Sequence, residues 1–250
     1  ADMPNHAYFT IDTLAELEAK WPLILEQRPD FLKTFVLFTD TPRAEGLSAE
    51  VLNAVVERAH RAGLRVSSHI ETANDFRVAV DAGVDEINHL PIAHGADLAP
   101  YVISDEAARL AAKKGITVVT TLRPIRMPGA PQGPSKPEVL ALHAQNLARL
   151  RRAGVTLAVG SDGISGEEPF ATAQDEALFL HANKLAGNLA LLRMWSENTP
   201  RTIFPHRKIG ALRDGYEASF LVLDGNPLED FTSVTKIVMR VKQGSVLSGV

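Results

Sequence analysis

The chain has 250 residues, enough for one large domain, and its 45% hydrophobic and 22% charged residues are typical of a globular protein. The net charge of −4 leaves no basic surplus for binding nucleic acid, and no apolar run approaches the roughly 20 residues of a membrane-spanning helix. The absence of cysteine excludes disulfides, iron–sulfur clusters and thiol nucleophiles, but it leaves cytoplasmic, periplasmic and secreted locations open.

The predicted elements alternate between helix and strand along most of the chain. Helices are predicted at 11–28, 48–62, 72–82, 104–114 and 137–153, and strands at 31–38, 64–71, 85–90, 116–122 and 155–162. More helix is expected to about residue 197, and the proline-rich stretch 123–137 is expected to form a loop. Strands separated by single amphipathic helices indicate parallel βαβ units, and therefore an α/β fold.

Three local features refine these boundaries. Pro22 lies inside the first helix and predicts a break or kink there. Ser48 is a suitable N-cap for the second helix, and a glycine such as Gly63 follows each predicted helix of the repeating part. From Gly210 the sequence changes to short β-rich runs separated by turns, which predicts a small antiparallel module.

Chemically active side chains lie at the ends of the predicted strands. His69 and Glu71 end the second strand, His89 ends the third and Asp162 ends the fifth. Parallel α/β folds bind ligands beyond the carboxyl ends of their strands, so these side chains are expected to converge. Imidazole and carboxylate are ligands of zinc, manganese or iron. Lys33 is expected to be buried, because strands of a parallel sheet are covered on both faces.

Each candidate has a plain structural alternative. A strand histidine commonly serves only as a hydrogen-bonding residue, and Lys33 could extend from a strand end to the surface. Asp162 could form a turn, and Glu71 could cap the helix that starts near Thr72. His94, in a loop near the strand ends, is a candidate substrate contact with the same bland alternative, and the helical residues His60 and His143 are interpreted as surface or packing residues.

The order of these motifs resembles the metal-dependent amidohydrolase superfamily, in particular its imidazolonepropionase-like branch. The motifs are a strand lysine, then SHIET, INHL and VGSDG, followed by ENTPRTIF, IGALRDGYEASFLVLDGNPLED and VKQGSVL. The resemblance covers the chain from about residue 31 to the end. It implies a (β/α)8 barrel at 1–205, of which strands four to eight are present, and the C-terminal part of a β-sandwich at 206–250.

The resemblance also implies a site. Lys33 corresponds to a fourth-strand lysine that is often carbamylated to bridge two metals. His69 and His89 correspond to the histidine ligands of the fifth and sixth strands. Asp162 corresponds to the eighth-strand aspartate, which binds metal and carries a proton, and Glu71 stands where some members place an acidic proton carrier. The implied cofactor is one or two divalent ions, with zinc preferred.

One feature departs from the family pattern. The first barrel strand of the family carries a His-x-His pair of metal ligands, and no His-x-His occurs in this sequence. An arc of five strands would leave two open sheet edges, which are prone to aggregation. We therefore expect a missing N-terminal segment or a partner chain, with a homo-oligomer as one form of partner.

Two functions follow from these features. The first is a metal-dependent hydrolase that cleaves a C–N bond in a small cyclic amide, peptide-like amide or amino-ring substrate by means of activated water. The second is a non-catalytic pseudo-enzyme or assembly subunit that lacks a complete metal site. The metal content of the purified chain discriminates between the two hypotheses.

Overall fold

The computed structural model describes residues 8–42, 44–93, 96–123, 137–163 and 172–248. Two compact units can be distinguished by their internal contacts. The first comprises Ala1–Val118 and Arg149–Val155, and the second comprises Val119–Ala148 and Thr156–Val250. The division between a barrel at 1–205 and a sandwich at 206–250 stays a prediction.

The first unit contains the predicted alternation of helices and strands. Its elements are α1 (Leu14–Glu26), β1 (Phe31–Leu37), β2 (Glu45–Gly46), α2 (Ala49–Arg61), β3 (Arg65–Ile70), α3 (Ala73–Ala82), β4 (Glu86–Asn88), the 3-10 helix η1 (Ala99–Tyr101) and α4 (Asp105–Lys113). β5 (Thr117–Thr120) begins in this unit and ends in the second, whereas α5 (Pro137–Ala153) begins in the second and ends in the first. The two-residue strand β2 is the one element of this unit's sheet that the sequence did not predict.

Capping residues explain where the helices begin and end. The Ser48 side chain accepts the N–H of Val51, as the sequence predicted for an N-cap. Thr72 and Asp75 form a reciprocal capping box at the start of α3, and Gly83 ends that helix in the left-handed conformation with φ 79°. Glu71 is therefore not the cap of α3.

The helix is not broken at Pro22, because α1 continues through this residue to Glu26, whereas a kink there stays a prediction. A proline removes one backbone donor within a helix, which is normally costly. Here the apolar face of α1 is held in a core cluster with Leu17 fully buried and Ile24 9% exposed, against Val51 and Val55 of α2. This burial on both sides of Pro22 favours a continuous helix.

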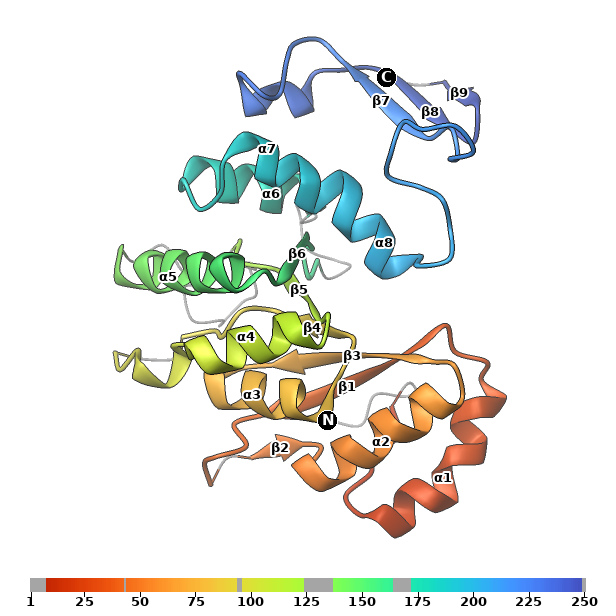
Figure 1. Ribbon diagram of the computed structural model, residues 1–250, viewed down its shortest axis with the longest axis vertical. Coiled ribbons are helices and arrows are strands. Elements are labelled where there is room, and N and C mark those ends of the chain that lie inside the picture. The colour runs from red at the N-terminus through yellow and green to blue at the C-terminus, as the bar shows by residue number, and fades with distance from the viewer. Residues whose placement is uncertain (1–7, 43, 94–95, 124–136, 164–171, 249–250) are drawn as a thin grey trace. The chain divides into compact units, whose positions relative to one another are not determined.

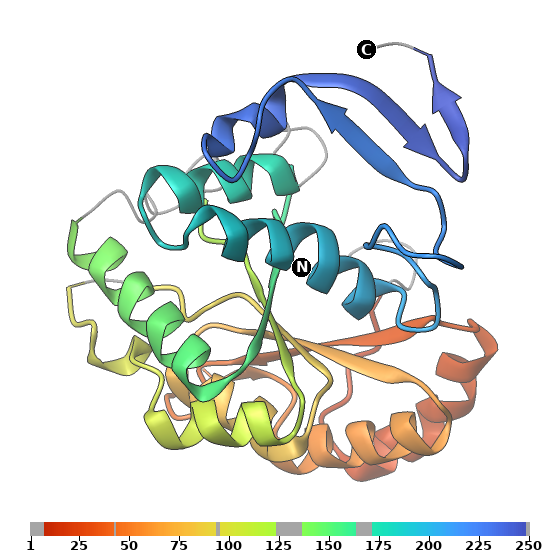
Figure 2. The same cartoon turned by 45° about the horizontal axis from the view of Figure 1, so that its top comes forward.

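The sheet of the first unit is parallel at its centre and covered by helices on one face. Hydrogen-bonded neighbours follow the order β2-β1-β3-β4, and the pairs β1–β3 and β3–β4 are parallel. Figures 1 and 2 show α2 and α3 along the same face of β1 and β3. Alternate residues that point to this face are fully buried, among them Val36, Val66 and Ile70. The opposite face is thereby left to carry polar side chains.

The outer edge of β1 is partly covered. β2 pairs with β1 in antiparallel fashion through Val36–Gly46 and Leu37–Glu45, and the N–H of Leu47 donates to the carbonyl of Phe35 at 2.8 Å. Gly46 has φ 77°, and a Cβ atom there would lie 2.3 Å from the carbonyl oxygen of Phe35. Only glycine fits this close approach.

The second unit continues with β6 (Thr156–Val159), α6 (Ala173–Ala182), α7 (Asn188–Leu192), the π-helix η2 (Arg193–Asn198) and α8 (Thr199–Ile203). The N–H of Gly160 donates to the carbonyl of Thr120. The backbone N–H and carbonyl groups of Leu157 and Val159 therefore point to the other edge of β6. Side chains satisfy that edge: Asn198 donates to the Leu157 carbonyl at 2.8 Å, and the Thr199 hydroxyl accepts the Val159 N–H at 3.0 Å.

These contacts modify the expectation of two open sheet edges. The strand pair at β1 and the side-chain bonds at β6 each use backbone groups that would otherwise face outward. Short edge strands and covering elements are recognised ways of blocking edge-to-edge association.

The predicted C-terminal antiparallel module is confirmed. It consists of β7 (Phe220–Leu223), the 3-10 helix η3 (Phe231–Thr235), β8 (Ile237–Lys242) and β9 (Ser245–Leu247), with the strands paired in the order β7-β8-β9. Large apolar side chains of this sheet are exposed: Leu221, Val222, Val238, Val246 and Leu247. None of the helices in the described ranges is long and apolar enough to cross a membrane.

A buried carboxylate holds the end of β5 in the second unit. Glu176, fully buried in the first turn of α6, accepts the N–H groups of Leu122 at 2.9 Å and Arg123 at 2.7 Å. Burial raises the pKa of Glu176 above its ordinary value of 4.5, although the two N–H groups act in the opposite direction. Between these two pKa values the folded chain holds a proton that the unfolded chain has lost.

The stabilising contribution of Glu176 is therefore fully present below pH 4.5 and is lost as the pH rises through the folded-state pKa. We expect the unfolding free energy of the wild type to fall, relative to that of Glu176→Gln, as the pH is raised from 4.5 toward neutrality. Urea unfolding at several pH values measures this difference. Glu138→Gln, an exposed first-turn residue of α5, is the control and should parallel the wild type. Parallel curves for Glu176→Gln and the wild type would contradict the prediction.

Candidate functional site

Polar side chains gather on the face of the first unit's sheet opposite its helices. Residues paired across parallel strands point to the same side of a sheet. The register forms two successive rows on this face: Lys33, Ser67 and Glu86, and then, nearer the carboxyl ends, Phe35, His69 and Asn88.

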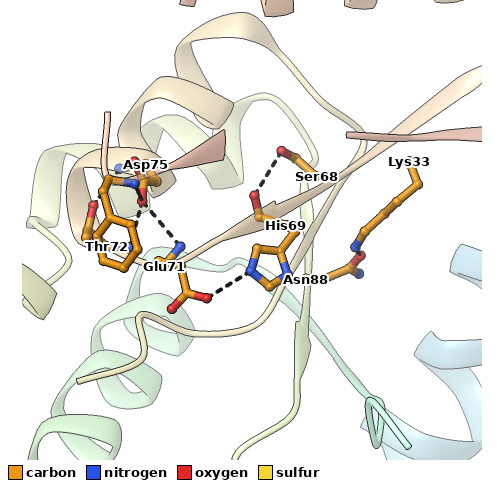
Figure 3. A network of polar contacts seen from close by, with 8 residues as sticks. Lys33, Ser68, His69, Glu71, Thr72, Asp75 and Asn88 are labelled. Atoms are coloured by element: carbon orange, nitrogen blue, oxygen red, sulfur yellow. Dashed lines mark hydrogen bonds and ion pairs between the residues drawn. The ribbon is translucent and has the colours of Figure 1, made fainter. Parts of the chain in front are cut away.

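Asn88 links these rows through its side-chain amide. Its Oδ1 accepts hydrogen bonds from the Lys33 ammonium and from the Ser67 hydroxyl, the latter at 2.7 Å. Its Nδ2 donates to the Glu86 carboxylate at 2.9 Å, and the same carboxylate oxygen lies 3.1 Å from the Ser67 hydroxyl, as an alternative acceptor for its single proton. Figure 3 shows Lys33 and Asn88 pointing toward each other beside His69. The amide thus fixes the end of β4 immediately before His89.

The prediction that Lys33 is buried is wrong, because this residue is exposed. Lys33 lies on the face away from the helices, whereas its neighbour Thr34 lies on the helix side and is 6% exposed. The rule that both faces of a parallel sheet are covered therefore fails at this position of β1. The ammonium finds its partner in the amide of Asn88.

The two predicted histidines lie together at the ends of adjacent strands. The ring centroids of His69 and His89 are 4.4 Å apart in an edge-to-face arrangement. His89 is 3% exposed, and burial lowers its pKa to about 3, with nearby His69 and Lys33 acting in the same direction and Glu71 opposing. His89 is therefore a neutral imidazole at neutral pH, which is the form that binds a metal.

Glu71 lies directly against His69. One carboxylate oxygen of Glu71 is 3.1 Å from Nε2 of His69, and both side chains are mostly buried, with 16% and 18% of their surface exposed. The dashed line between the two residues in Figure 3 marks this contact. A carboxylate in this place can orient the imidazole and can accept or return a proton beside it.

Backbone strain occurs where three strands end. Phe38, His89 and Asp162 have positive φ angles of 51°, 77° and 48°; the first two directly follow β1 and β4, and Asp162 is the third residue after β6. Non-glycine residues rarely adopt this conformation, and such strain is concentrated at functional sites. Asn88 points to the sheet face that carries His69, so the next residue of a regular strand would point away from it. His89, with its positive φ, instead packs its ring against that of His69.

The remaining predicted residues are only partly described. Asp162 is exposed and belongs to the second unit, so its convergence with His69 and His89 stays a prediction. His94 lies outside the described residues. Among the residues with described positions, no group of three or more His, Asp or Glu side chains could hold a metal ion. The neighbouring imidazoles of His69 and His89 fit two ligands of a divalent ion.

Sequence reasoning missed Asn88, Ser67 and Asp75. Asn88 and Ser67 were visible as polar positions next to, or two residues before, a predicted ligand in a strand. Asp75 was visible as the fourth residue of Thr72-Ala-Asn-Asp, a capping pattern, but its fully buried carboxylate also accepts bonds from Phe38 and Thr39. Those partners are distant in sequence and could not be derived from the pattern alone.

The family follows from comparison with known proteins. A model of the amidohydrolase family matches residues 25–247. The chain belongs to the amidohydrolase family. This confirms the predicted superfamily, whose members are hydrolytic enzymes that generally use divalent metals, while the imidazolonepropionase-like branch stays a prediction.

A curated relative and two solved structures extend the comparison. Ochratoxinase of Aspergillus niger is 30% identical over 224 residues, which make up 83% of this chain and 43% of the ochratoxinase. This chain therefore spans less than half the length of that relative. The crystal structure of A. niger ochratoxinase matches with a TM-score of 0.73 at 23% identity and covers 100% of this chain and 58% of that one.

The second solved structure is that of a prolidase and contains N-methylphosphonate-L-proline. It matches with a TM-score of 0.72 at 21% identity over 95% of this chain and 59% of the prolidase. At this level of identity the structural matches establish the fold. They confirm an amidohydrolase α/β fold in which this chain forms part of a barrel, with an antiparallel sheet at the C-terminus.

The amide of Asn88 should stabilise this part of the amidohydrolase sheet. Asn88→Ala removes the acceptor of Lys33 and Ser67 and the donor to Glu86, so we expect the unfolding free energy to fall by about 1–3 kcal/mol. Chemical denaturation measures this loss. Asn53→Ala, on the exposed surface of α2, is the control and should stay within about 0.5 kcal/mol of the wild type. Equal stability of the two variants would show that the Asn88 network contributes nothing.

Proposed function

We propose that this protein takes part in hydrolysis of an amide-type C–N bond in a small molecule, at a divalent-metal site to which His69, His89 and Asp162 contribute. The observation that carries the proposal is the pair of imidazoles at adjacent strand ends, with centroids 4.4 Å apart and His89 buried and neutral. Membership of the amidohydrolase family supports the reaction class. The hydrolytic activity of the whole protein is likewise proposed.

The proposed metal is zinc, because neutral imidazole and carboxylate are its usual nitrogen and oxygen ligands. When bound, such an ion lowers the pKa of a water molecule and polarises the scissile carbonyl. Carbamylation of Lys33 would require an unprotonated amine shielded from water, whereas Lys33 is exposed and donates a hydrogen bond to Asn88. The proposed site therefore does not depend on a carbamate at Lys33.

Asp162 and Glu71 accept and donate protons in the proposed reaction. Asp162 accepts the proton of the attacking water and returns it to the leaving nitrogen. Glu71 holds the His69 ring through Nε2 and serves as a second proton carrier beside it. The exposure of Asp162 leaves its carboxylate accessible to substrate and water.

Among the substrates considered, a peptide-like amide is favoured over a cyclic amide or an amino ring. The supporting comparison is the prolidase crystallised with N-methylphosphonate-L-proline, a molecule containing an amino acid. The ochratoxinase relative, named for ochratoxin, is compatible with an amide substrate. His94 stays proposed as a substrate contact.

The competing proposal is a pseudo-enzyme or an assembly subunit. It starts from the lack of a His-x-His pair in this sequence, the pair that supplies two metal ligands in the family pattern. In the hydrolase proposal, further ligands complete the site in the purified protein, and a second copy of the chain is one source of them. Metal content therefore separates the two proposals.

Asp162→Asn tests the hydrolase proposal. The substitution removes the proton acceptor without changing the size of an exposed side chain, so stability should be unchanged and the rate of dipeptide hydrolysis should fall by on the order of 100- to 10,000-fold. The assay uses the zinc-loaded protein with and without a chelator, and metal content is measured by elemental analysis. Asp224→Asn, an exposed aspartate of the same unit, is the matched control.

The outcomes separate the alternatives. Bound zinc, turnover that the chelator abolishes, and loss of turnover in Asp162→Asn alone would support the hydrolase. A folded wild-type protein that retains no zinc and cleaves no amide would favour the assembly subunit. Equal activity of Asp162→Asn and Asp224→Asn would remove Asp162 from the mechanism.

A further inference from the structure

Asp75 is a fully buried aspartate that accepts hydrogen bonds from two separate turns. Its Oδ1 accepts the N–H of Thr39 at 2.8 Å and the hydroxyl of Thr39 at 2.7 Å. Its Oδ2 accepts the N–H groups of Phe38 at 2.9 Å, Thr72 at 2.9 Å and Glu71 at 3.3 Å. A buried carboxylate is tolerated only when it is well hydrogen-bonded, and these five donors meet that requirement.

A second helix of the same chain shows what a capping role alone requires. α6 begins with Thr172-Ala-Gln-Asp175 and α3 with Thr72-Ala-Asn-Asp75, and both form a capping box. Among the described residues, the bonds that Asp175 accepts come from the N–H and hydroxyl of Thr172, each at 2.8 Å, and this aspartate is only half-buried. Asp75 has the capping bonds and adds the bonds to Phe38, Thr39 and Glu71. These additional contacts are not needed to start a helix.

The additional contacts join the two turns that border the candidate site. Phe38 follows β1 with a strained φ of 51°, and its N–H is held by Asp75. Glu71 follows β3, and its carboxylate contacts Nε2 of His69 at 3.1 Å. Figure 3 shows Asp75 bonded to the backbone of Glu71 while the Glu71 side chain extends to His69. Asn74 adds a further link by donating to the Thr39 hydroxyl at 2.8 Å.

We propose that Asp75 is a positioning residue of the hydrolytic site: it ties the turn after β1 to the turn after β3, and thereby keeps the Glu71 carboxylate on the His69 imidazole. This inference rests on the proposed function for its catalytic consequence. Its structural part, the coupling of Phe38 and Thr39 to Glu71, is independent of that function.

Asp75→Asn tests the coupling. Asparagine offers one acceptor oxygen, so its amide nitrogen must face either the Thr39 donors or the cluster of Phe38, Glu71 and Thr72 donors. We expect faster amide hydrogen exchange at Phe38, Thr39 and Glu71, in addition to the first turn of α3. Asp175→Asn is the matched control, with faster exchange expected only at the start of α6.

A second measurement follows the site itself. Cobalt(II) titration of the zinc-free protein reports on His69, and Asp75→Asn should weaken cobalt affinity by on the order of 10-fold, the usual effect of losing a residue that orients a ligand. Asp175→Asn should bind cobalt as the wild type does. Thr39→Val removes the hydroxyl bond to Asp75 while it leaves the capping box intact, and it should speed exchange at Phe38 and Thr39 even if Asp75→Asn does not fold.

The results discriminate between positioning and simple capping. Faster exchange confined to Thr72 and α3 in Asp75→Asn, or unchanged exchange at Phe38 in Thr39→Val, would overturn the positioning role. Unchanged cobalt affinity in Asp75→Asn would overturn its link to the site. If the wild type binds no cobalt, the proposed function fails, and the exchange data alone then decide whether Asp75 couples the two turns.

Discussion

The carboxyl ends of the strands depend on buried carboxylates that satisfy backbone donors where the sheet can no longer do so. When a strand turns into its loop, its N–H groups lose their neighbours, and burying them unpaired would be costly. Asp75 at the start of α3 accepts the N–H groups of Phe38 and Thr39 after β1. Glu176 at the start of α6 accepts those of Leu122 and Arg123 after β5. In each unit a helix that follows one strand thus fixes the end of another.

This constraint allows strain to persist at the strand ends. A phenylalanine with φ 51° would be expected to relax in an unsupported loop, because the left-handed conformation is unfavourable for a residue with a Cβ. The N–H of Phe38 donates to Asp75. His89, whose backbone φ is 77°, has a buried ring that packs beside His69. Strained residues persist where several contacts determine their conformation, which is typical of sites that orient reactive groups.

The sequence predicted what local patterns determine and missed what distant contacts determine. Ser48 and Gly83 marked helix ends because a cap is a short-range interaction, and His69 and His89 were found because strand ends can be read from periodicity. The continuous helix at Pro22, the exposure of Lys33 and the edge bonds of Thr199 depend on packing or pairing between residues far apart in sequence. Asp75 belongs to both classes. Its capping role can be predicted from the four residues of the capping box, whereas its bond to Phe38 joins residues 37 positions apart.

The formal charges on the sheet face opposite the helices of the first unit suit the binding of a cation by imidazole and carboxylate ligands. Glu71 and Glu86 carry two formal negative charges, Lys33 carries one positive charge, and buried His89 is neutral. The formal charges of these two carboxylates and the ammonium leave one negative charge next to two imidazoles, an arrangement that attracts a cation. Had His89 been protonated, its charge would have opposed both metal binding and the approach of Lys33. The burial that makes His89 a poor proton acceptor therefore also makes it an available metal ligand, and a single property of the fold accounts for both.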